Sequence, residues 1–290
     1  IEDLGIVCLV LLLGLEWGLS MNWRQVHDLP ILNYIAFLYN KFGVMPYKEL
    51  FETSMPGSLL FHIMLTHIIG YSDLALRIFD LLYFVLIAIV SYKLFSKIDK
   101  RASLIGICFF GLYYLWEGHS MTLERDYLAI LPIIVAFYFM EKGKKQFVSG
   151  FFWGVAFWIK PHLLIGLLPI SVFYYSNFRI LLKQKLVQFA IGFFLFSSSI
   201  LVWLIVNDAL FSWWQIFTKY LPLHIKMPHN LVILESKDRW PYLWKGLSTF
   251  GQQSKWLFPL FVVMVMVIFA KYEKRSKHLV YLLISLVFVY

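Results

Sequence analysis

The chain has 290 residues, of which 60% are hydrophobic, 19% aromatic and only 15% charged. Soluble proteins carry about 25% charged residues, so this chain has too few polar side chains to cover a water-facing globule. Its formal net charge of +9 does not indicate a nucleic-acid partner, because the basic residues are spread over short breaks between apolar runs. The composition therefore predicts an integral membrane protein that contacts membrane lipid.

Apolar runs recur along the whole chain, and polar breaks separate them. They predict spanning helices at residues 4–19, 76–94, 102–116, 127–140, 147–159, 162–175, 186–206, 256–270 and from 279 onward. Several runs are shorter than the ~20 residues of a perpendicular crossing, which flanking aromatic residues and local bilayer thinning can accommodate. Because the last run is cut off by the end of the sequence, we expect a piece of a longer chain.

The charge of the polar breaks predicts how the helices are oriented. Lys and Arg are dense at residues 97–101, 141–145, 179–185 and 271–278. By the positive-inside rule these four breaks face the cytoplasm, and alternation of the predicted spans places all of them on one side. The outer face then receives the loops at residues 21–75, 117–126 and 207–255, together with the tight turn at Lys160-Pro161.

One apolar segment within the first outer loop does not fit as a crossing. Residues 58–69 include His62 and His67 and are too few to span a bilayer, so we expect a helix on the outer surface. The sequence thus predicts a single all-α domain over residues 1–290: a polytopic transmembrane helical bundle whose outer-face loops contain short surface helices.

The first outer loop begins with an acidic residue close to the membrane edge. Asp28 follows the first span by a few residues, in His27-Asp28-Leu29-Pro30. A carboxylate there can accept a proton from an acceptor hydroxyl or amine that attacks a sugar carbon. The same residue is suited to cap a helix over residues 31–39, with Pro30 in its first turn. The two roles are compatible, and both stay open.

Two further outer segments carry charges that suit a phosphate group. Glu124-Arg125-Asp126 precedes the span at residues 127–140, and an arginine offers bidentate donors to phosphate. Lys160 and His162 lie in a turn between two apolar runs, where an unpaired lysine is costly unless it binds an anion or reaches the surface. For the first segment the alternative is an ordinary ion-paired loop, and for Lys160 it is snorkelling to the interface.

The late outer loop is the third candidate region. It carries His224, His229 and Arg239 among aromatic residues, a mixture that fits a phosphate-plus-sugar site and equally fits an interfacial aromatic belt. The histidines lack the spacing of zinc ligands. The sequence also lacks a P-loop, a Gly-rich nucleotide fingerprint and an esterase nucleophile elbow, so it shows no nucleotide-binding motif. A sugar donor carried by a lipid would explain that absence.

Several motifs together resemble a known family. The first outer loop combines Asp28 with Gly43-Val44-Met45-Pro46-Tyr47 and Met55-Pro56-Gly57-Ser58. It resembles the first outer loop of GT-C-fold glycosyltransferases, which include protein O-mannosyltransferases, the aminoarabinose transferases of lipid A and the oligosaccharyltransferase catalytic subunit. Ile69-Gly70-Tyr71-Ser72 with Arg77, and Gly150 and Gly154 with Lys160, resemble two later segments of that family. The resemblance covers roughly residues 1–175.

The resemblance implies an inverting transfer of a sugar from a polyprenyl-phosphate donor to a glycan, lipid or protein acceptor. It implies Asp28 as the catalytic base and Glu124 or Asp126 as the acid of the second outer loop. Arg125, Lys160, His162 and Arg239 are the residues we expect to bind the substrate or its lipid phosphate. The transfer is either metal-independent or assisted by a divalent metal ion, and because neither loop has an Asp-Asp or Asp-x-Asp pair we assign no metal ligand.

Two other functions remain open from the sequence. One is a polysaccharide ligase or polymerase that uses His224, His229 and Arg239 of the late loop. The other is a transporter or flippase of a lipid-linked sugar, although the chain shows neither broken polar helices nor internal repeats. No Asn-x-Ser/Thr site occurs, which favours a bacterial inner membrane with the active site facing the periplasm.

Overall fold

The structure is a computed structural model that describes residues 2–97, 99–142, 145–166, 182–220 and 222–223. The chain divides into two compact units, Ile1–His162 with Leu181–Ile216, and Leu163–Ile180 with Phe217–Tyr290. Nearly all described residues belong to the first unit.

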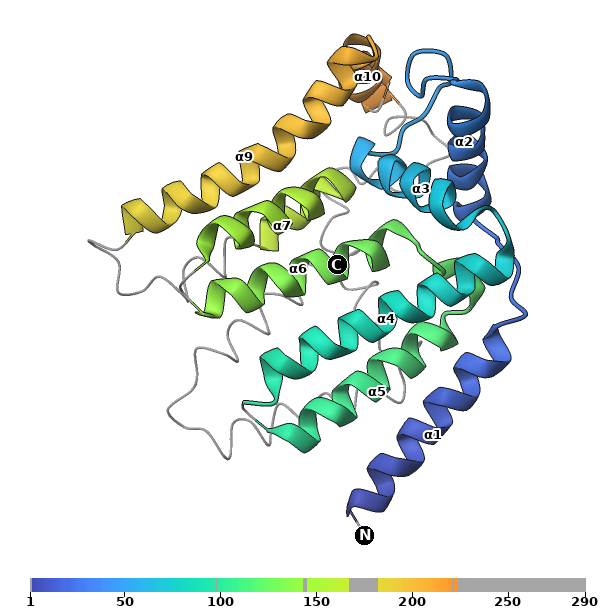
Figure 1. The fold of residues 1–290 in the computed structure, drawn as a ribbon, viewed down its shortest axis with the longest axis vertical. Coiled ribbons are helices and arrows are strands. Elements are labelled where there is room, and N and C mark those ends of the chain that lie inside the picture. Colours follow the sequence, from blue (N-terminus) through green and yellow to red (C-terminus); the bar gives the residue numbers. More distant parts are fainter. Residues whose placement is uncertain (1, 98, 143–144, 167–181, 221, 224–290) are drawn as a thin grey trace, which may run out of the picture. The chain divides into compact units, whose positions relative to one another are not determined.

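The described residues are mostly helical and contain no strand beyond a single bridge between Pro46 and Leu50. In chain order the elements are α1 (Glu2–Ser20), α2 (Leu29–Phe42), α3 (Pro56–Ile69), α4 (Asp73–Phe95), α5 (Lys100–Trp116), the 3₁₀ turn η1 (His119–Met121), α6 (Arg125–Lys142), α7 (Gln146–Ile159), the 3₁₀ turn η2 (Pro161–Gly166), α9 (Leu182–Val206), α10 (Leu210–Gln215) and the π-helical η3 (Ile216–Tyr220) (Figure 1).

The predicted helical class is confirmed for the described residues. The expected helices at 4–19, 76–94, 102–116, 127–140, 147–159 and 186–206 fall within α1, α4, α5, α6, α7 and α9. The expected surface helices at 31–39 and 58–69 fall within α2 and α3. The spans predicted at 256–270 and from 279 onward lie outside the described residues, as does most of the late loop.

The segment after α7 differs from its prediction. Where we expected a spanning helix from residue 162, the described part is the 3₁₀ turn Pro161–Gly166. The chain leaves α7 at Lys160, which has an extended backbone with φ −152° and ψ 98°. The physical cause is Pro161, because the ring of a proline pushes the preceding residue out of the α-helical region.

The long helices of the first unit pack in a row. Neighbouring pairs along this row are α1 with α5, α5 with α4, α4 with α6, α6 with α7, and α7 with α9. The short helices α2 and α3 pack on each other, and α3 also packs on α7. Figure 1 shows α2 and α3 beside the C-terminal end of α1 and the N-terminal end of α4.

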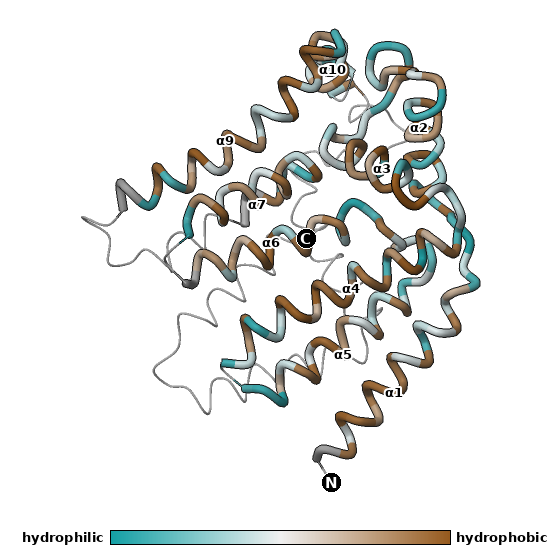
Figure 2. Tube along the Cα trace, in the orientation of Figure 1, coloured by the Kyte–Doolittle hydropathy of each residue, from teal (hydrophilic) through white to brown (hydrophobic). Residues whose placement is uncertain are grey.

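The outward surfaces of the row are apolar. Two helices, Asp73–Phe95 and Lys185–Val206, are long and apolar enough to cross a membrane, and only 33% and 22% of their most apolar windows are buried. Shorter apolar helices occur at Leu4–Ser20, Pro56–Ile69 and Gln146–Ile159. Figure 2 shows hydrophobic residues along most of α1 and α4, with hydrophilic residues in the connections between helices.

Glycines allow α7 and α9 to touch backbone to backbone. A Cβ atom added at Gly150 would lie 1.9 Å from the carbonyl oxygen of Phe189, and one added at Gly192 would lie 1.9 Å from that of Phe147. Gly154 follows Gly150 by one helical turn, and a Cβ atom added there would lie 3.0 Å from the Phe193 carbonyl oxygen. Such a small-xxx-small pattern is how helices approach closely in an apolar environment.

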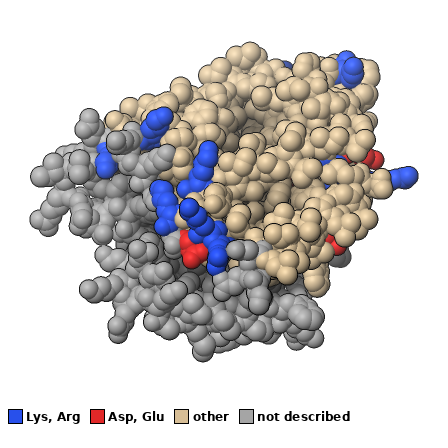
Figure 3. Space-filling view, turned by 60° about the horizontal axis from the view of Figure 1, so that its bottom comes forward, with Lys and Arg blue, Asp and Glu red and all other residues tan. Residues whose placement is uncertain are grey.

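The charged residues differ between the two ends of these parallel and antiparallel helices. Lys97 lies between α4 and α5, and Lys100 and Arg101 begin α5. Lys142 ends α6, and Lys145 directly precedes α7. We call this the basic end. In a view that brings the bottom of Figure 1 forward, Lys and Arg side chains gather in one area (Figure 3). At the opposite end, which we call the α2–α3 end, the acidic candidates meet.

Candidate functional site

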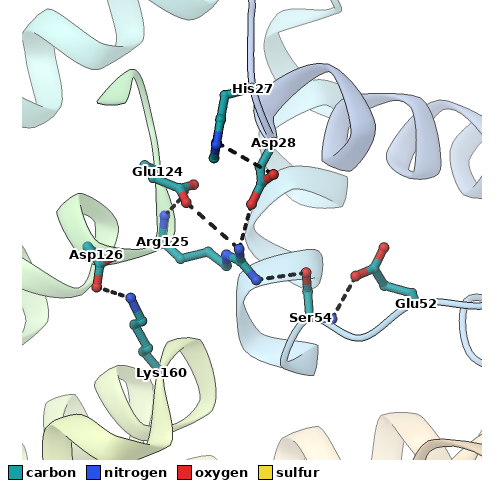
Figure 4. Close-up of polar contacts among 8 residues, drawn as sticks. All are labelled: His27, Asp28, Glu52, Ser54, Glu124, Arg125, Asp126 and Lys160. Carbon is teal, nitrogen blue, oxygen red and sulfur yellow. Dashed lines mark hydrogen bonds and ion pairs between the residues drawn. The ribbon is translucent and has the colours of Figure 1, made fainter. Parts of the chain in front are cut away.

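An ion pair between two distant segments forms the centre of the candidate site. Nη2 of Arg125 lies 2.5 Å from Oδ2 of Asp28, although the two residues are 97 positions apart in sequence. Their side chains are 30% and 32% exposed, so the pair lies at a surface that solvent reaches. Figure 4 shows the Arg125 side chain extending toward Asp28 and Ser54.

Local backbone structure explains why Asp28 faces this pair. Asp28 occupies the position before α2 and is followed by Pro30 in the first turn, yet its carboxylate makes no capping hydrogen bond. His27 has φ +61°, a left-handed conformation that is uncommon for a side chain with a Cβ. The chain thereby turns Asp28 toward Arg125. The carboxylate therefore pairs with the Arg125 guanidinium and makes no hydrogen bond to the backbone of α2.

Two more side chains surround the pair. Oε1 of Glu124 lies 3.8 Å from Nη2 of Arg125, and its other oxygen accepts a 3.0 Å hydrogen bond from the Arg125 backbone amide. Nδ1 of His27 lies 3.5 Å from Oδ1 of Asp28. The guanidinium is therefore shared by two carboxylates, which is a common way of holding several acids close together.

His27, Asp28 and Glu124 also form a candidate cation cluster. Each offers one ligand atom, and the three atoms lie within 4.8 Å of one another. One imidazole nitrogen with two carboxylate oxygens suits a divalent metal ion by donor type. The Arg125 guanidinium contacts the same two carboxylates, so a metal ion would compete with a cation that the chain itself provides.

A second ion pair lies beside the first. Nζ of Lys160 contacts Oδ1 of Asp126, and the two side chains are 27% and 52% exposed. Lys160 thus comes from the end of α7 and Asp126 from the first turn of α6. Lys160 therefore has an anionic partner within the chain. His162 follows in η2 and is exposed.

The turn before α3 supplies a neutral contact. Nη1 of Arg125 donates to Oγ of Ser54 over 3.3 Å. Ser54 is held in turn by two hydrogen bonds: its backbone amide donates to Glu52 over 2.6 Å, and its carbonyl accepts from the Tyr47 hydroxyl over 2.7 Å. Burial and the nearby charge of Glu52 raise the pKa of Tyr47, so this hydroxyl keeps its proton.

Beneath these charges a buried network ties α3 to α2. His62 is fully buried, and its Nδ1 lies 3.1 Å from Oδ1 of Asn33. The Asn33 amide group donates to Oε1 of Gln25 over 2.6 Å, so Oδ1 of Asn33 is an acceptor and Nδ1 of His62 carries the proton. Burial, followed by the positive charge of Arg125, lowers the pKa of His62 to about 3. The imidazole is therefore neutral.

A buried ion pair positions the loop that carries Arg125. Arg77 and Asp80 are one helical turn apart on α4, are 1% and 0% exposed, and contact each other directly. Arg77 donates to Oγ of Ser20 at the end of α1 over 2.7 Å and to Thr122 over 3.4 Å. The hydroxyl of Tyr114 donates to Asp80 over 2.7 Å. Because Thr122 precedes Arg125 by only three residues, Arg77 links the site loop to α1 and α4.

The structure brings together most of the sequence-predicted residues. Asp28, Glu124 and Arg125 form one cluster, and Asp126 with Lys160 forms a second beside it. Arg239, His224 and His229 lie outside the described residues.

Sequence reasoning missed Ser54, His62 with Asn33, and Asp80 as parts of the site or its support. A sequence signal existed for Asp80, because an acid one helical turn after Arg77 in an apolar helix indicates a buried ion pair.

Comparisons of the chain with protein-family models, with curated proteins and with solved structures found no match.

Proposed function

We propose that this chain is an integral membrane glycosyltransferase that transfers a sugar from a polyprenyl-phosphate donor to an acceptor at the outer face of the membrane. The observation that carries the proposal is the ion pair between Asp28 and Arg125, which joins a carboxylate to a phosphate-binding type of side chain at one end of an apolar helical row. The donor phosphate and the acceptor would meet at this end, opposite the basic end.

The apolar surfaces of the helices support the membrane part of the proposal. The windows of α4 and α9 that are long enough for a crossing are mostly unburied, and water-facing helices do not carry such surfaces. The Lys and Arg residues of the basic end fit a cytoplasmic position. The α2–α3 end then faces the outside, in keeping with a bacterial inner membrane and a periplasmic site.

The proposed reaction is a single displacement. The acceptor hydroxyl attacks the anomeric carbon, the bond from that carbon to the phosphate oxygen breaks, and the configuration inverts. Asp28 takes the hydroxyl proton, and the lipid phosphate leaves with the bonding electron pair. Arg125 and Lys160 stabilise the negative charge on that phosphate, which is the electrostatic contribution of fixed cations. Glu124 holds the backbone and side chain of Arg125.

The ion pairs imply an order of events. Without donor, Arg125 holds Asp28 and Lys160 holds Asp126, so each cation is already paired with an acid. A phosphate that draws Arg125 toward itself frees the Asp28 carboxylate to act as a base. The base is thus exposed only when a donor is bound, which limits wasteful attack by water.

The experiment compares two acids of the α2–α3 end. Transfer of a radiolabelled sugar is measured from a panel of polyprenyl-phosphate and polyprenyl-diphosphate donors, with the Asp28→Asn and Asp208→Asn variants. Asp208 also forms a long-range ion pair, at 2.9 Å from Lys48, but its side chain is 88% exposed. We expect Asp28→Asn to lose at least about 10³-fold in kcat and to bind donor as before, while Asp208→Asn stays active.

If the Asp28→Asn variant transferred the sugar as fast as the wild-type protein does, Asp28 would not be the base. No transfer from any donor, combined with uptake of a lipid-linked sugar into liposomes, would replace the transferase by a transporter.

A further inference from the structure

A groove runs between α4 and α5 near the basic end, far along the helices from Asp28. Its volume is about 410 Å³, within the ~300–1,000 Å³ of ligand pockets. One wall includes Ile87, Ser91 and Phe95 of α4, and the other includes Ser103, Gly106 and Phe110 of α5. Apart from two serine hydroxyls and Asp99, the walls are apolar.

Small residues create the space in this groove. A Cβ atom added at Gly106 would meet no other atom within 4 Å, so the groove is open where a side chain of ordinary size would fill it. Ala88 and Ala102 line the same space.

Basic side chains lie beside the mouth of the groove. Asp99 lines it where α4 turns into α5, and its carboxylate accepts a 2.9 Å hydrogen bond from the Ala102 amide. Lys97, Lys100 and Arg101 are exposed and lie within two residues of Asp99, so basic side chains cluster where α4 turns into α5. The first turn of α5 adds the positive end of its helix dipole.

We propose that this groove binds an anionic glycerophospholipid of the cytoplasmic leaflet, with one acyl chain between α4 and α5 and the phosphate at Lys100. The inference rests on the membrane insertion in the proposed function and on no part of the transfer reaction. An apolar channel that ends in a basic cluster on the cytoplasmic side is the arrangement that recognises anionic lipid headgroups.

The test measures lipid binding to the full chain in a mild non-ionic detergent by native mass spectrometry. Dioleoyl phosphatidylglycerol is compared with dioleoyl phosphatidylcholine, which has the same acyl chains, and with a polyprenyl phosphate. The variant Gly106→Leu fills the groove, and Gly14→Leu is its matched control, because Gly14 also lies in a helix with nothing within 4 Å of its added Cβ. Ser91→Leu fills the groove from the opposite wall.

We expect wild-type protein to bind phosphatidylglycerol more tightly than phosphatidylcholine. Gly106→Leu and Ser91→Leu should lower the affinity for the first bound phosphatidylglycerol molecule by about tenfold, since excluding about two methylene groups has that effect. Gly14→Leu should bind this lipid as the wild type does. Lys100→Gln should reduce the preference for phosphatidylglycerol and leave phosphatidylcholine binding unchanged.

Three results would overturn the proposal. Unchanged binding in both groove-filling variants, each with a wild-type melting temperature, places the lipid elsewhere. Equal binding of the two phospholipids removes the role of charge. Preference for polyprenyl phosphate makes the groove a second site for the donor type of lipid. Because no result depends on sugar transfer, lipid binding in a chain without transferase activity would reject the proposed function and keep the groove.

Discussion

Arg125 connects three separate parts of the site through one planar group. Its guanidinium contacts Asp28 ahead of α2, Ser54 ahead of α3 and Glu124 of its own loop. Arginine can do this because it presents several N–H donors in a fixed plane, whereas lysine offers a single ammonium. A lysine at this position would therefore keep the positive charge and change only the geometry of the contacts.

We therefore expect Arg125→Lys to keep the charge and lose the bridge. The predicted result is a fall of about 10²-fold in kcat/KM for the lipid-linked donor, the scale on which a misplaced electrostatic contact lowers turnover. The control is Lys48→Gln, which breaks the exposed ion pair with Asp208 and should leave kcat/KM unchanged. An Arg125→Lys enzyme as active as wild type would show that charge alone suffices at this position.

His62 provides a second prediction at the residue scale, through pH. Its pKa in the folded chain is about 3, whereas an unfolded histidine titrates near ~6.5. Between these two pKa values the histidine is protonated in the unfolded chain and neutral in the folded chain. Its contribution to the free energy of unfolding is therefore fully present above about pH 6.5 and is lost as the pH falls toward 3. The slope contributed by His62 approaches ~1.4 kcal/mol per pH unit.

Replacing His62 by Gln should remove this slope while retaining a donor toward Asn33. The measurement is the melting temperature of wild type, His62→Gln and His67→Gln between pH 7.5 and 4.5. His67 lies on the same helix but is exposed, so its variant should follow the wild-type curve. If His62→Gln loses as much stability on acidification as wild type does, the imidazole is not the group that responds.

At the element scale, the glycine contacts between α7 and α9 predict a specific failure of packing. The Cβ atom of a leucine at position 192 would lie 1.9 Å from the Phe147 carbonyl oxygen, so the two helices must separate. We expect Gly192→Leu to lower the melting temperature by at least about 5 °C, because overpacking a tight contact costs about 1–3 kcal/mol or more.

Gly5→Leu on α1 is the matched control for this change. It makes the same substitution in an apolar helix where nothing lies within 4 Å of the added Cβ, so the higher helix propensity of leucine affects both variants alike. A melting temperature of Gly192→Leu equal to that of Gly5→Leu would contradict a close α7–α9 crossing.

The helices were predictable for reasons that do not extend to the site. A run such as residues 76–94 is apolar throughout, and α3 begins at Pro56 and ends before Gly70, signals that lie within a few residues of the boundary they mark. The pairing of Asp28 with Arg125 depends instead on α6 packing next to α4 in the row. No local pattern specifies that order.

The residues missed in the sequence show the same limit. His62 and Asn33 are 29 positions apart in sequence, and no local pattern links the two segments. Only the packing of α3 on α2 makes one the partner of the other. The loop charges were predictable as a group because basic residues mark one side of a membrane protein, which requires no knowledge of contacts.

At the scale of the whole molecule, the distribution of charge between the two ends predicts how the helices are oriented in the membrane. The basic end carries Lys97, Lys100 and Arg101, and the opposite end carries the site together with Lys48 and Asp208. In a membrane these two ends face different compartments. The proposed function requires the site to be outside, and the proposed lipid groove requires its mouth to be inside.

Single-cysteine labelling of intact bacterial cells tests both requirements at once. Cys8, which is exposed, and Cys108, which is buried, are first replaced by Ala, and a cysteine is then placed at Lys48 or at Lys100, two exposed lysines at opposite ends. A membrane-impermeant maleimide should label Lys48→Cys in intact cells and Lys100→Cys only after permeabilisation, because the lysine-rich connections are retained in the cytoplasm. The inverse pattern would place Asp28 in the cytoplasm and exclude a periplasmic transfer. Labelling of both positions in intact cells would mean that the row does not cross the membrane, and neither the proposed function nor the lipid groove would stand.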